Sequence, residues 1–198
     1  TERPVYLDRL PPCNHACPAS ENIQGWLFHA EAGDYEAAWR KLTEDNPLPA
    51  VMGRVCYHPC EGACNRGNVD SAVGINSIER FLGDEAIRRG WKFSPPAASS
   101  GKRVLVVGAG PSGLSAAYHL ARLGPRVTIH DAGPVAGGMM RFGIPNYRLP
   151  RDVLDAEVKR IVDLGVELKL DSRVDSILAS MKKGGFDAAF LAVGAHIG

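Results

Sequence analysis

The feature that most constrains the fold is a glycine-rich turn between an apolar run and an amphipathic stretch. The run KRVLVV is followed by the pattern G-x-G-x-x-G at Gly108, Gly110 and Gly113. A buried strand, this turn and a helix in direct succession open a parallel βαβ unit. We therefore expect a strand over Arg103–Val107 and a helix from about Ser112 to Leu123.

Each glycine of this turn has its own purpose in dinucleotide-binding folds. Gly108 permits the tight turn, Gly110 lets the backbone approach a pyrophosphate at the helix N-terminus, and Gly113 allows close helix–strand contact. A second apolar run, Arg126–His130, ends at Asp131, about where such folds place an acid that binds ribose hydroxyls. The alternative for Asp131 is an ordinary residue at a strand end. A lone G-x-G-x-x-G is weak evidence, but this order of elements predicts a dinucleotide site.

The segment KFSPPAASSG, residues 92–101, divides the chain into two halves of different pattern. Its prolines and its Ala, Ser and Gly residues favour an extended, solvated connector. Before it, apolar residues recur at helical spacing; after it, short Val/Leu/Ile runs alternate with longer amphipathic stretches, which is typical of a parallel sheet with crossover helices. We expect a helical domain over 1–91, a linker over 92–101 and an α/β domain over 102–198.

Composition argues against several classes of partner. The formal net charge is +1 and the charged residues are evenly mixed, which gives no electrostatic footprint for nucleic acid or an anionic membrane. No run approaches the roughly 18 apolar residues of a membrane span, and residues 1–10 lack the layout of a signal peptide. We therefore expect a cytoplasmic protein whose partners are other proteins and cofactors.

Three helices are expected in the first half of the chain. Ser20 can cap a helix over Glu21–Ala32, and Asp34 can cap the next, from Tyr35 to about Thr43. A third helix is expected over Gly74–Arg89. The tryptophans of the first two helices are interpreted as core packing.

The third helix has one charged residue in its apolar face. At about 100° per residue, this face collects four apolar residues, Ile75, Ile78, Leu82 and Ala86. Glu79 points into the middle of the face, and a carboxylate directed at a core is costly unless it is paired or bound to a metal. The alternative to a metal ligand is a salt bridge to an arginine such as Arg54 or Arg66.

All five cysteines lie in the first 64 residues, as Cys13-x3-Cys17-Pro and Cys56-x3-Cys60-x3-Cys64. An odd, clustered set in such a chain indicates metal or redox chemistry rather than a disulfide framework. Thiolates at short spacing, one of them followed by proline, are typical of iron–sulfur ligation. Zinc, which favours Cys-x2-Cys, and free or structural cysteines are the alternatives.

Four runs in this half resemble one known domain. They are PCNHACP, NPLPAVMGRVC, CEGACNRG and VGINSIERF. Together they are similar to the helical iron–sulfur domain of the glutamate synthase small-subunit family, which the N-terminal part of dihydropyrimidine dehydrogenase and the larger subunit of NADH-dependent ferredoxin:NADP oxidoreductase share. The resemblance covers nearly the whole chain. It implies an all-helical, α-helical ferredoxin-like domain followed by a partial Rossmann-like FAD-binding domain with a parallel sheet.

The resemblance also implies a ligand set. Two [4Fe-4S] clusters are typical of the family, and one takes a side-chain oxygen in place of a fourth cysteine. By position, the ligands of that cluster would be Cys17, Cys56, Cys60 and Glu79. The other cluster would need Cys13 and Cys64 plus two upstream cysteines, but those positions are Val5 and Asp8, and two thiolates cannot supply four ligands. We therefore expect one cluster, held by four of the six candidate ligands Cys13, Cys17, Cys56, Cys60, Cys64 and Glu79.

Two later runs favour FAD over NAD. GGMMRFGIPNYRLP is similar to the segment that follows the FAD-binding turn in this family, and FDAAFLAVGA to the strand and glycine turn that close against the flavin nucleotide. The resemblance implies that Gly138 and Arg141 approach the flavin or its phosphates, that Val174 meets the adenine through its backbone, and that Gly194 packs against the cofactor; ordinary loop geometry is the alternative. The candidate cofactor-binding residues are Gly108, Gly110, Pro111, Ser112, Gly113, Asp131, Gly138, Arg141, Val174 and Gly194.

The resemblance finally implies an electron-transfer subunit of an NAD(P)H-linked oxidoreductase, which passes electrons between FAD and a [4Fe-4S] cluster to or from a partner enzyme. In the family an NAD(P)H domain follows the turn at Gly194, so we expect an N-terminal fragment or one piece of a split protein, with little activity alone. The alternative is a non-catalytic, metal-stapled module that docks subunits. No catalytic triad or acid–base pair stands out. The partner, the nicotinamide type and the oligomeric state stay open.

Overall fold

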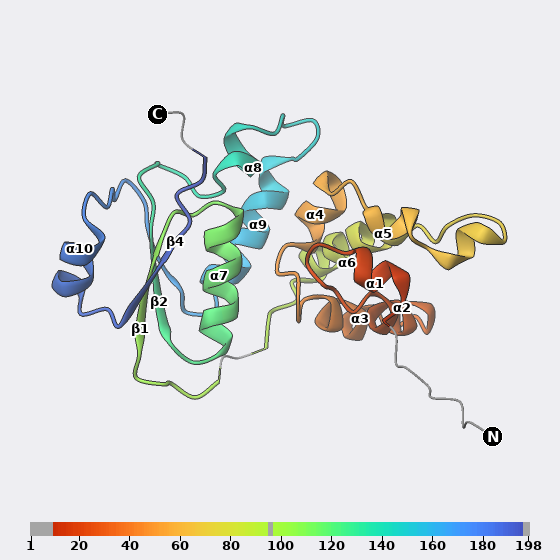
Figure 1. Cartoon of the computed structure of the whole chain (residues 1–198), viewed down its shortest axis with the longest axis horizontal. Helices are drawn as coiled ribbons and strands as arrows, with labels where there is room; N and C mark the ends of the chain where they lie inside the picture. Colours follow the sequence, from red (N-terminus) through yellow and green to blue (C-terminus); the bar gives the residue numbers. More distant parts are fainter. Residues whose placement is uncertain (1–9, 95–96, 196–198) are drawn as a thin grey trace, which may run out of the picture. The chain divides into compact units, whose positions relative to one another are not determined.

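The computed structural model describes residues 10–94 and 97–195. The chain divides into two compact units, residues 1–82 and 83–198, and the division falls within helix α6, Ile75–Arg89 (Figure 1). Val5, Asp8 and residues 95–96 of the expected linker lie outside the described residues. The linker boundaries over 92–101 stay a prediction.

The first unit is helical, as predicted. Besides the start of α6, its helices are α1 (Pro12–Ala16), α2 (Ile23–Glu31), α3 (Tyr35–Leu42), α4 (Pro49–Val55), α5 (Pro59–Gly62) and the 3-10 turn η1 (Asn65–Asn68). Helices α2 and α3 pack against each other, and α1 contacts both α2 and α5. The tryptophans predicted to be core residues, Trp26 and Trp39, are fully buried. Their burial confirms the interpretation of the aromatic stripe as packing.

Of the two N-caps predicted from the sequence, one is confirmed and one is wrong. Asp34 caps α3 as predicted, because its side chain accepts a hydrogen bond from the N–H of Ala37 at 3.1 Å. The prediction that Ser20 caps α2 is wrong: the N-cap is Asn22, whose side chain accepts from the N–H of Gly25 at 3.0 Å. The buried Glu21 explains the difference, because a residue directed into the core before the helix delays its first turn.

Three short helices were not predicted from the sequence. Helices α1, α4 and α5 have four to seven residues, too few for a periodic pattern. Each has a proline in its first turn, at Pro12, Pro49 and Pro59. Proline at the first helical position is the signal that could have located them.

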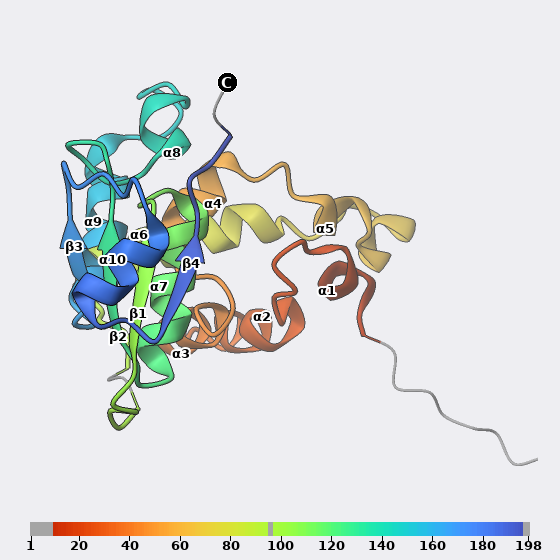
Figure 2. The same cartoon turned by 60° about the vertical axis from the view of Figure 1, so that its left-hand side comes forward.

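The second unit contains a parallel four-stranded sheet with the strand order β3-β2-β1-β4, which confirms the predicted α/β architecture (Figures 1 and 2). Its strands are β1 (Arg103–Val107), β2 (Arg126–His130), β3 (Glu167–Lys169) and β4 (Ala188–Leu191). Its further helices are α7 (Pro111–Arg122), α8 (Met139–Phe142), α9 (Arg151–Val162) and α10 (Ile177–Gly184). Strand β1 pairs with β2 and β4, so the carboxyl ends of these three strands meet at one edge.

The core of this unit lies between the sheet and helices α7 and α9. Leu105 and Ile129 of the sheet and Leu154 of α9 are fully buried, and α7 contacts β1, β2 and α9. Phe93 of the expected linker packs on Tyr118 with 4.6 Å between ring centroids, whereas residues 97–101 are exposed. Among the helices of the described ranges, none combines the length and apolar character of a membrane span.

Candidate functional site

The cysteines of the first unit lie on neighbouring short helices and the turns that follow them. Cys13 lies within α1 and Cys17 caps its end; Cys56 caps the end of α4, Cys60 lies in α5, and Cys64 precedes η1. Contact between α1 and α5 brings the first cysteine motif to the second, about 40 residues away in the chain. All five are free thiols, so they form no disulfide framework.

Three of these thiols share one environment. Cys60 is 7% exposed, and burial raises its pKa to about 12, with the charges of Cys17 and Cys56 adding to the rise. Burial also raises the pKa of Cys17, and the charges of Glu21 and Glu79 raise it further. The structure thus brings Cys17 and Cys56 close enough to Cys60 for their charges to affect its pKa, and it brings the carboxylate of Glu79 close enough to Cys17 to do the same.

Cys64 has a different environment. Its pKa is lowered, first by a hydrogen bond from the backbone N–H of Val73, and then by the N–H groups of Arg66 and Gly67 and the charge of Arg66. Arg66, one of the two arginines considered as partners of Glu79, forms an ion pair with Asp70 at 2.5 Å. Cys64 therefore lies in its own turn, where backbone donors favour its thiolate form.

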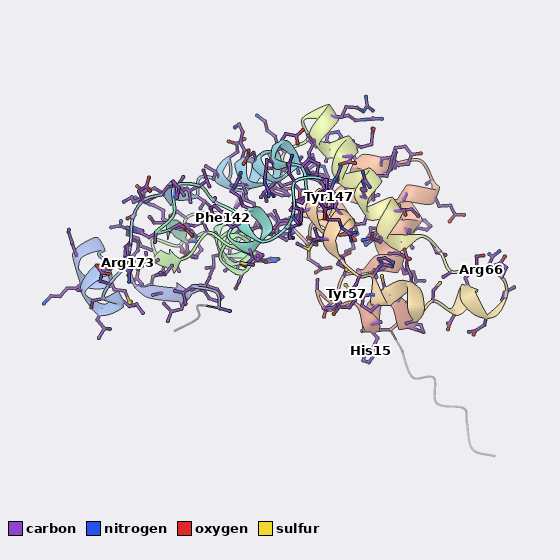
Figure 3. The ribbon with its side chains drawn as sticks, turned by 90° about the horizontal axis from the view of Figure 1, so that it is seen from above. His15, Tyr57, Arg66, Phe142, Tyr147 and Arg173 are labelled. Atoms are coloured by element: carbon purple, nitrogen blue, oxygen red, sulfur yellow. The ribbon has the colours of Figure 1, made fainter. Side chains whose placement is uncertain are left out.

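Backbone N–H groups also point at the sulfurs of the buried set. The N–H of His58 donates to Sγ of Cys56 at 3.2 Å, for which His58 adopts a left-handed φ of 46°. The N–H groups of Ala19 and Glu21 bond to the sulfur of Cys17. Hydrogen bonds to sulfur are one of the means by which proteins tune iron–sulfur clusters. Tyr57, between the two thiols of this turn, is 80% exposed and lies at the surface (Figure 3).

Glu79 is buried, as the helical periodicity predicted, and it belongs to a network that the sequence did not reveal. Its exposed fraction is 6%, and its Oε1 accepts a hydrogen bond from Nδ2 of Asn46 at 2.8 Å. The same Nδ2 donates to Oε1 of Glu21 at 3.0 Å. Asn46 and Glu21 are separated from Glu79 by 33 residues and more in the sequence, so no local spacing could have joined them.

The donor set fits an iron–sulfur cluster better than a single zinc ion. Thiolates with one oxygen ligand suit iron, and a cluster distributes its protein ligands over several iron atoms. A single ion needs all of its ligands within about 2.0–2.3 Å of one point. Within residues 10–94 and 97–195, no three His, Cys, Asp or Glu side chains are arranged to hold one ion.

The glycine turn of the second unit is built as the sequence predicted. Gly108 has a φ of +107°, and a Cβ there would collide with the carbonyl oxygen of Ala192. A Cβ on Gly113 would collide with the carbonyl oxygen of Gly108, so helix and strand can approach only without a side chain. Helix α7 begins after Gly110, and no side chain caps it, which leaves its first N–H groups directed at the space where a pyrophosphate would bind. Pro111 and Ser112 are exposed at this helix start.

Asp131 ties the glycine turn to the end of β2. Its Oδ2 accepts from the N–H of Ala109 at 2.6 Å and its Oδ1 from the N–H of Gly133 at 2.7 Å. A carboxylate has about four acceptor positions, so both oxygens keep room for a ribose hydroxyl. The N–H of Ser172 donates to the carbonyl oxygen of Asp131 at 2.7 Å, which brings the loop with Val174 alongside.

Gly137 and Gly138 pack against the glycine turn that follows β1. The N–H of Gly137 donates to the carbonyl oxygen of Ala109 at 2.8 Å, and a Cβ on Gly138 would lie 2.8 Å from Cα of Gly110. Gly138 has a φ of +50° and Gly194 one of +76°, conformations that favour glycine. These glycines, with Asp131, gather at the carboxyl ends of the central strands, where doubly wound folds bind nucleotides.

Two arginines hold the loop that follows this pair. Arg141, expected near the flavin or its phosphates, bonds to the carbonyl oxygen of Ala136 at 2.5 Å and forms an ion pair with Asp155. Arg151, which the sequence analysis missed, donates to three backbone carbonyls of the loop, those of Met140, Ile144 and Leu149. Phe142 and Tyr147 of the same loop are exposed (Figure 3).

Comparisons with known proteins match both halves of the chain. A family model of dihydropyrimidine dehydrogenase domain II, 4Fe-4S cluster, matches residues 8–91, and one of an NAD(P)-binding Rossmann-like domain matches residues 106–165. The glutamate synthase [NADPH] small chain of Escherichia coli is 35% identical over 94% of this chain. The chain belongs to the glutamate synthase small-subunit-like family. The predicted resemblance is thereby confirmed.

Other relatives carry the names of different oxidoreductase subunits. The NADP(+)-dependent formate dehydrogenase subunit beta of Moorella thermoacetica is 41% identical over 93% of this chain. The NADPH-Fe(3+) oxidoreductase subunit beta of Geobacter sulfurreducens is 40% identical over 96% of it. The chain spans 29% of the length of each of these two proteins and 40% of the E. coli protein.

Proposed function

We propose that this chain is the electron-transfer part of an NAD(P)H-linked oxidoreductase, in which FAD and one [4Fe-4S] cluster exchange electrons with a partner subunit. The observation that carries the proposal is the joining, in one chain, of a buried thiol–carboxylate site and a glycine-turn dinucleotide site. When bound, FAD and the cluster supply conversion between two-electron and one-electron transfer. The residues of the chain bind and orient both groups.

Cys17, Cys56, Cys60 and Glu79 would hold the cluster. Cys60 and Glu79 are shielded from water, and the peptide N–H groups directed at Cys17 and Cys56 favour the thiolate form that binds iron. Because burial holds the pKa of Cys60 near 12, this thiol must lose its proton when iron binds. Cys13 and Cys64 remain alternative candidates for the four ligands.

FAD is the dinucleotide that we propose for the second unit. Gly110, Pro111, Ser112 and the helix start would bind the pyrophosphate, and Asp131 the ribose. Gly138 lies against Gly110 in the space beside the pyrophosphate, as the FAD-type segment GGMMRFGIPNYRLP requires. Arg141, Val174 and Gly194 complete the proposed set.

The partner is proposed to be an oxidoreductase subunit rather than nucleic acid or a membrane. The near-neutral charge of the chain supports this choice, and relatives named as subunits of formate dehydrogenase and NADPH-Fe(3+) oxidoreductase supply the analogy. We propose that the parent protein uses NAD(P)H and works in the cytoplasm.

Photoreduction of the purified chain tests the proposal. Illumination with EDTA as a sacrificial donor reduces the bound flavin, and low-temperature EPR then detects the reduced cluster. We expect the cluster signal to grow as the flavin absorbance bleaches, and the Cys60→Ala chain to bleach without any signal. A protein that contains zinc and no iron would contradict electron transfer and support the subunit-docking alternative.

A further inference from the structure

The buried network beside the thiols contains two residues that the proposed ligand set does not explain. Glu21 and Asn46 are each 5% exposed, almost as buried as Glu79. Two carboxylates and an amide in a helical core are costly unless their hydrogen bonds are satisfied. The three side chains therefore depend on one another for their hydrogen bonds.

Asn46 is the centre of this network, and its amide has only one workable orientation. Its Oδ1 accepts from the N–H of Leu48 at 3.0 Å, which directs Nδ2 to the opposite side. An amide nitrogen has two hydrogens, and here one goes to Glu79 at 2.8 Å and one to Glu21 at 3.0 Å. A flipped amide would face both carboxylates with an oxygen, so the bond to Leu48 fixes the bridge.

Glu21 anchors the other end of the bridge. Its Oε2 accepts from Nε1 of Trp26 at 3.3 Å, and Trp26 is fully buried in α2. The backbone N–H of Glu21 is directed at the thiol of Cys17 and lowers its pKa, against the larger rise caused by burial. The chain of bonds thus runs from the core of α2 through Glu21 and Asn46 to Glu79 on α6, and it passes beside one of the thiols.

We propose that Asn46, braced by Glu21, is a positioning residue that holds the Glu79 carboxylate in the orientation in which it binds iron. The inference rests on the proposed function, because it takes Glu79 as a cluster ligand. A glutamate has three side-chain torsions, and ordering them before iron binds reduces the entropy lost on ligation. Partners of this kind behind a metal ligand typically change metal affinity or activity about 10–100-fold when they are mutated.

The decisive variant is Asn46→Asp. The aspartate keeps an oxygen for the N–H of Leu48, so the turn before α4 is retained, but it loses the donor that Glu79 and Glu21 share. We expect chelator-driven iron release from the anaerobic chain to accelerate about 10-fold or more, and the EPR g-values of the reduced cluster to change. Asn76→Asp is the matched control, since its half-buried amide donates to a backbone carbonyl, that of Met52.

A double-mutant cycle separates positioning from a general structural effect. In a Glu79→Ala background, Asn46→Asp should change iron release and EPR no further, because the carboxylate that Asn46 holds is gone. Glu21→Gln, which leaves Asn46 intact and weakens the brace, should change the EPR spectrum in the same direction by a smaller amount. This variant keeps the test decisive even if Asn46→Asp does not fold.

Three results would overturn the inference. One is an iron-loaded wild type in which both Asn46→Asp and Glu21→Gln leave the spectrum and release rate unchanged. Another is an equal effect of Asn46→Asp with and without Glu79, which would show a structural role while the proposed function stands. A wild-type chain that binds no iron would overturn the proposed function and the positioning role together.

Discussion

The two units of this chain differ in what their candidate sites are made of: side chains in the first unit and backbone in the second. In the helical unit the proposed ligands are side chains, the half-buried thiols of Cys17 and Cys56, the buried thiol of Cys60 and the buried carboxylate of Glu79. In the Rossmann-like unit the site is made of backbone, where glycines leave room and N–H groups point at the cofactor space. Substitutions should therefore have opposite effects: removing a side chain should disable the first site, and adding one should disable the second.

The largest expected effect is in the helical unit. Cys60→Ala removes the most buried thiol of the set, so we expect complete loss of cluster iron while FAD binding is unchanged. Iron analysis and flavin absorbance of the anaerobic protein measure the two independently. Cys13→Ala is the control and should keep its iron. Full iron retention in Cys60→Ala would contradict the proposed ligand set.

The matching experiment in the Rossmann-like unit adds one methyl group. A Cβ on Gly110 would find its nearest neighbour, Cα of Gly138, at 3.9 Å, so the folded protein has room for Gly110→Ala. The methyl would fill the space that a pyrophosphate needs, and we expect FAD affinity to fall about 100-fold with an unchanged melting temperature. Gly108→Ala is the contrast and should lower the melting temperature itself. Normal FAD affinity in Gly110→Ala would contradict the assignment of the turn.

Thiol reactivity should differ within the helical unit. Backbone donors lower the pKa of Cys64, so more of it is thiolate at pH 7, whereas burial holds the pKa of Cys60 near 12 and keeps it protonated. In the iron-free chain we expect iodoacetamide to label Cys64 at least about 10-fold faster than Cys60 at pH 7. The rate at Cys60 should rise as pH increases toward 12. Equal rates by mass spectrometry would show that the two thiols share one environment.

The smallest expected effect concerns the one side chain that shapes the backbone site. Asp131→Asn keeps one acceptor oxygen but turns an NH₂ group toward either the N–H of Ala109 or that of Gly133. We expect FAD to bind about 5-fold more weakly, close to the 1 kcal/mol of one ordinary hydrogen bond. Flavin fluorescence titration measures the change. Asp163→Asn, an exposed acid at the end of α9, should have no effect, and equal losses in both variants would argue against a ribose contact.

The same contrast explains what the sequence could predict. A backbone site needs glycines at fixed spacing, so Gly108, Gly110, Gly113 and the strand and helix around them were located from the sequence alone. Asp34 as a cap and Glu79 as an inward residue followed from local periodicity in the same way. Local patterns are sufficient wherever the determining contacts are local.

The unpredicted features depend on contacts between residues distant in sequence. Asn46 joins Glu21 to Glu79 only in the folded unit, because Glu79 lies on α6, far along the chain. Likewise, Arg141 pairs with Asp155 across the turn between two helices. Asn22 replaced Ser20 as the cap because Glu21 is drawn into the core. Competing tertiary contacts, rather than weak propensities, account for these differences.

Cofactor content of the chain purified without oxygen tests the central claim most directly. The measurement is iron, acid-labile sulfide, zinc and flavin per chain. The account predicts about four iron and four sulfide in one cluster, together with bound FAD. One zinc ion, or neither iron nor flavin, would contradict it.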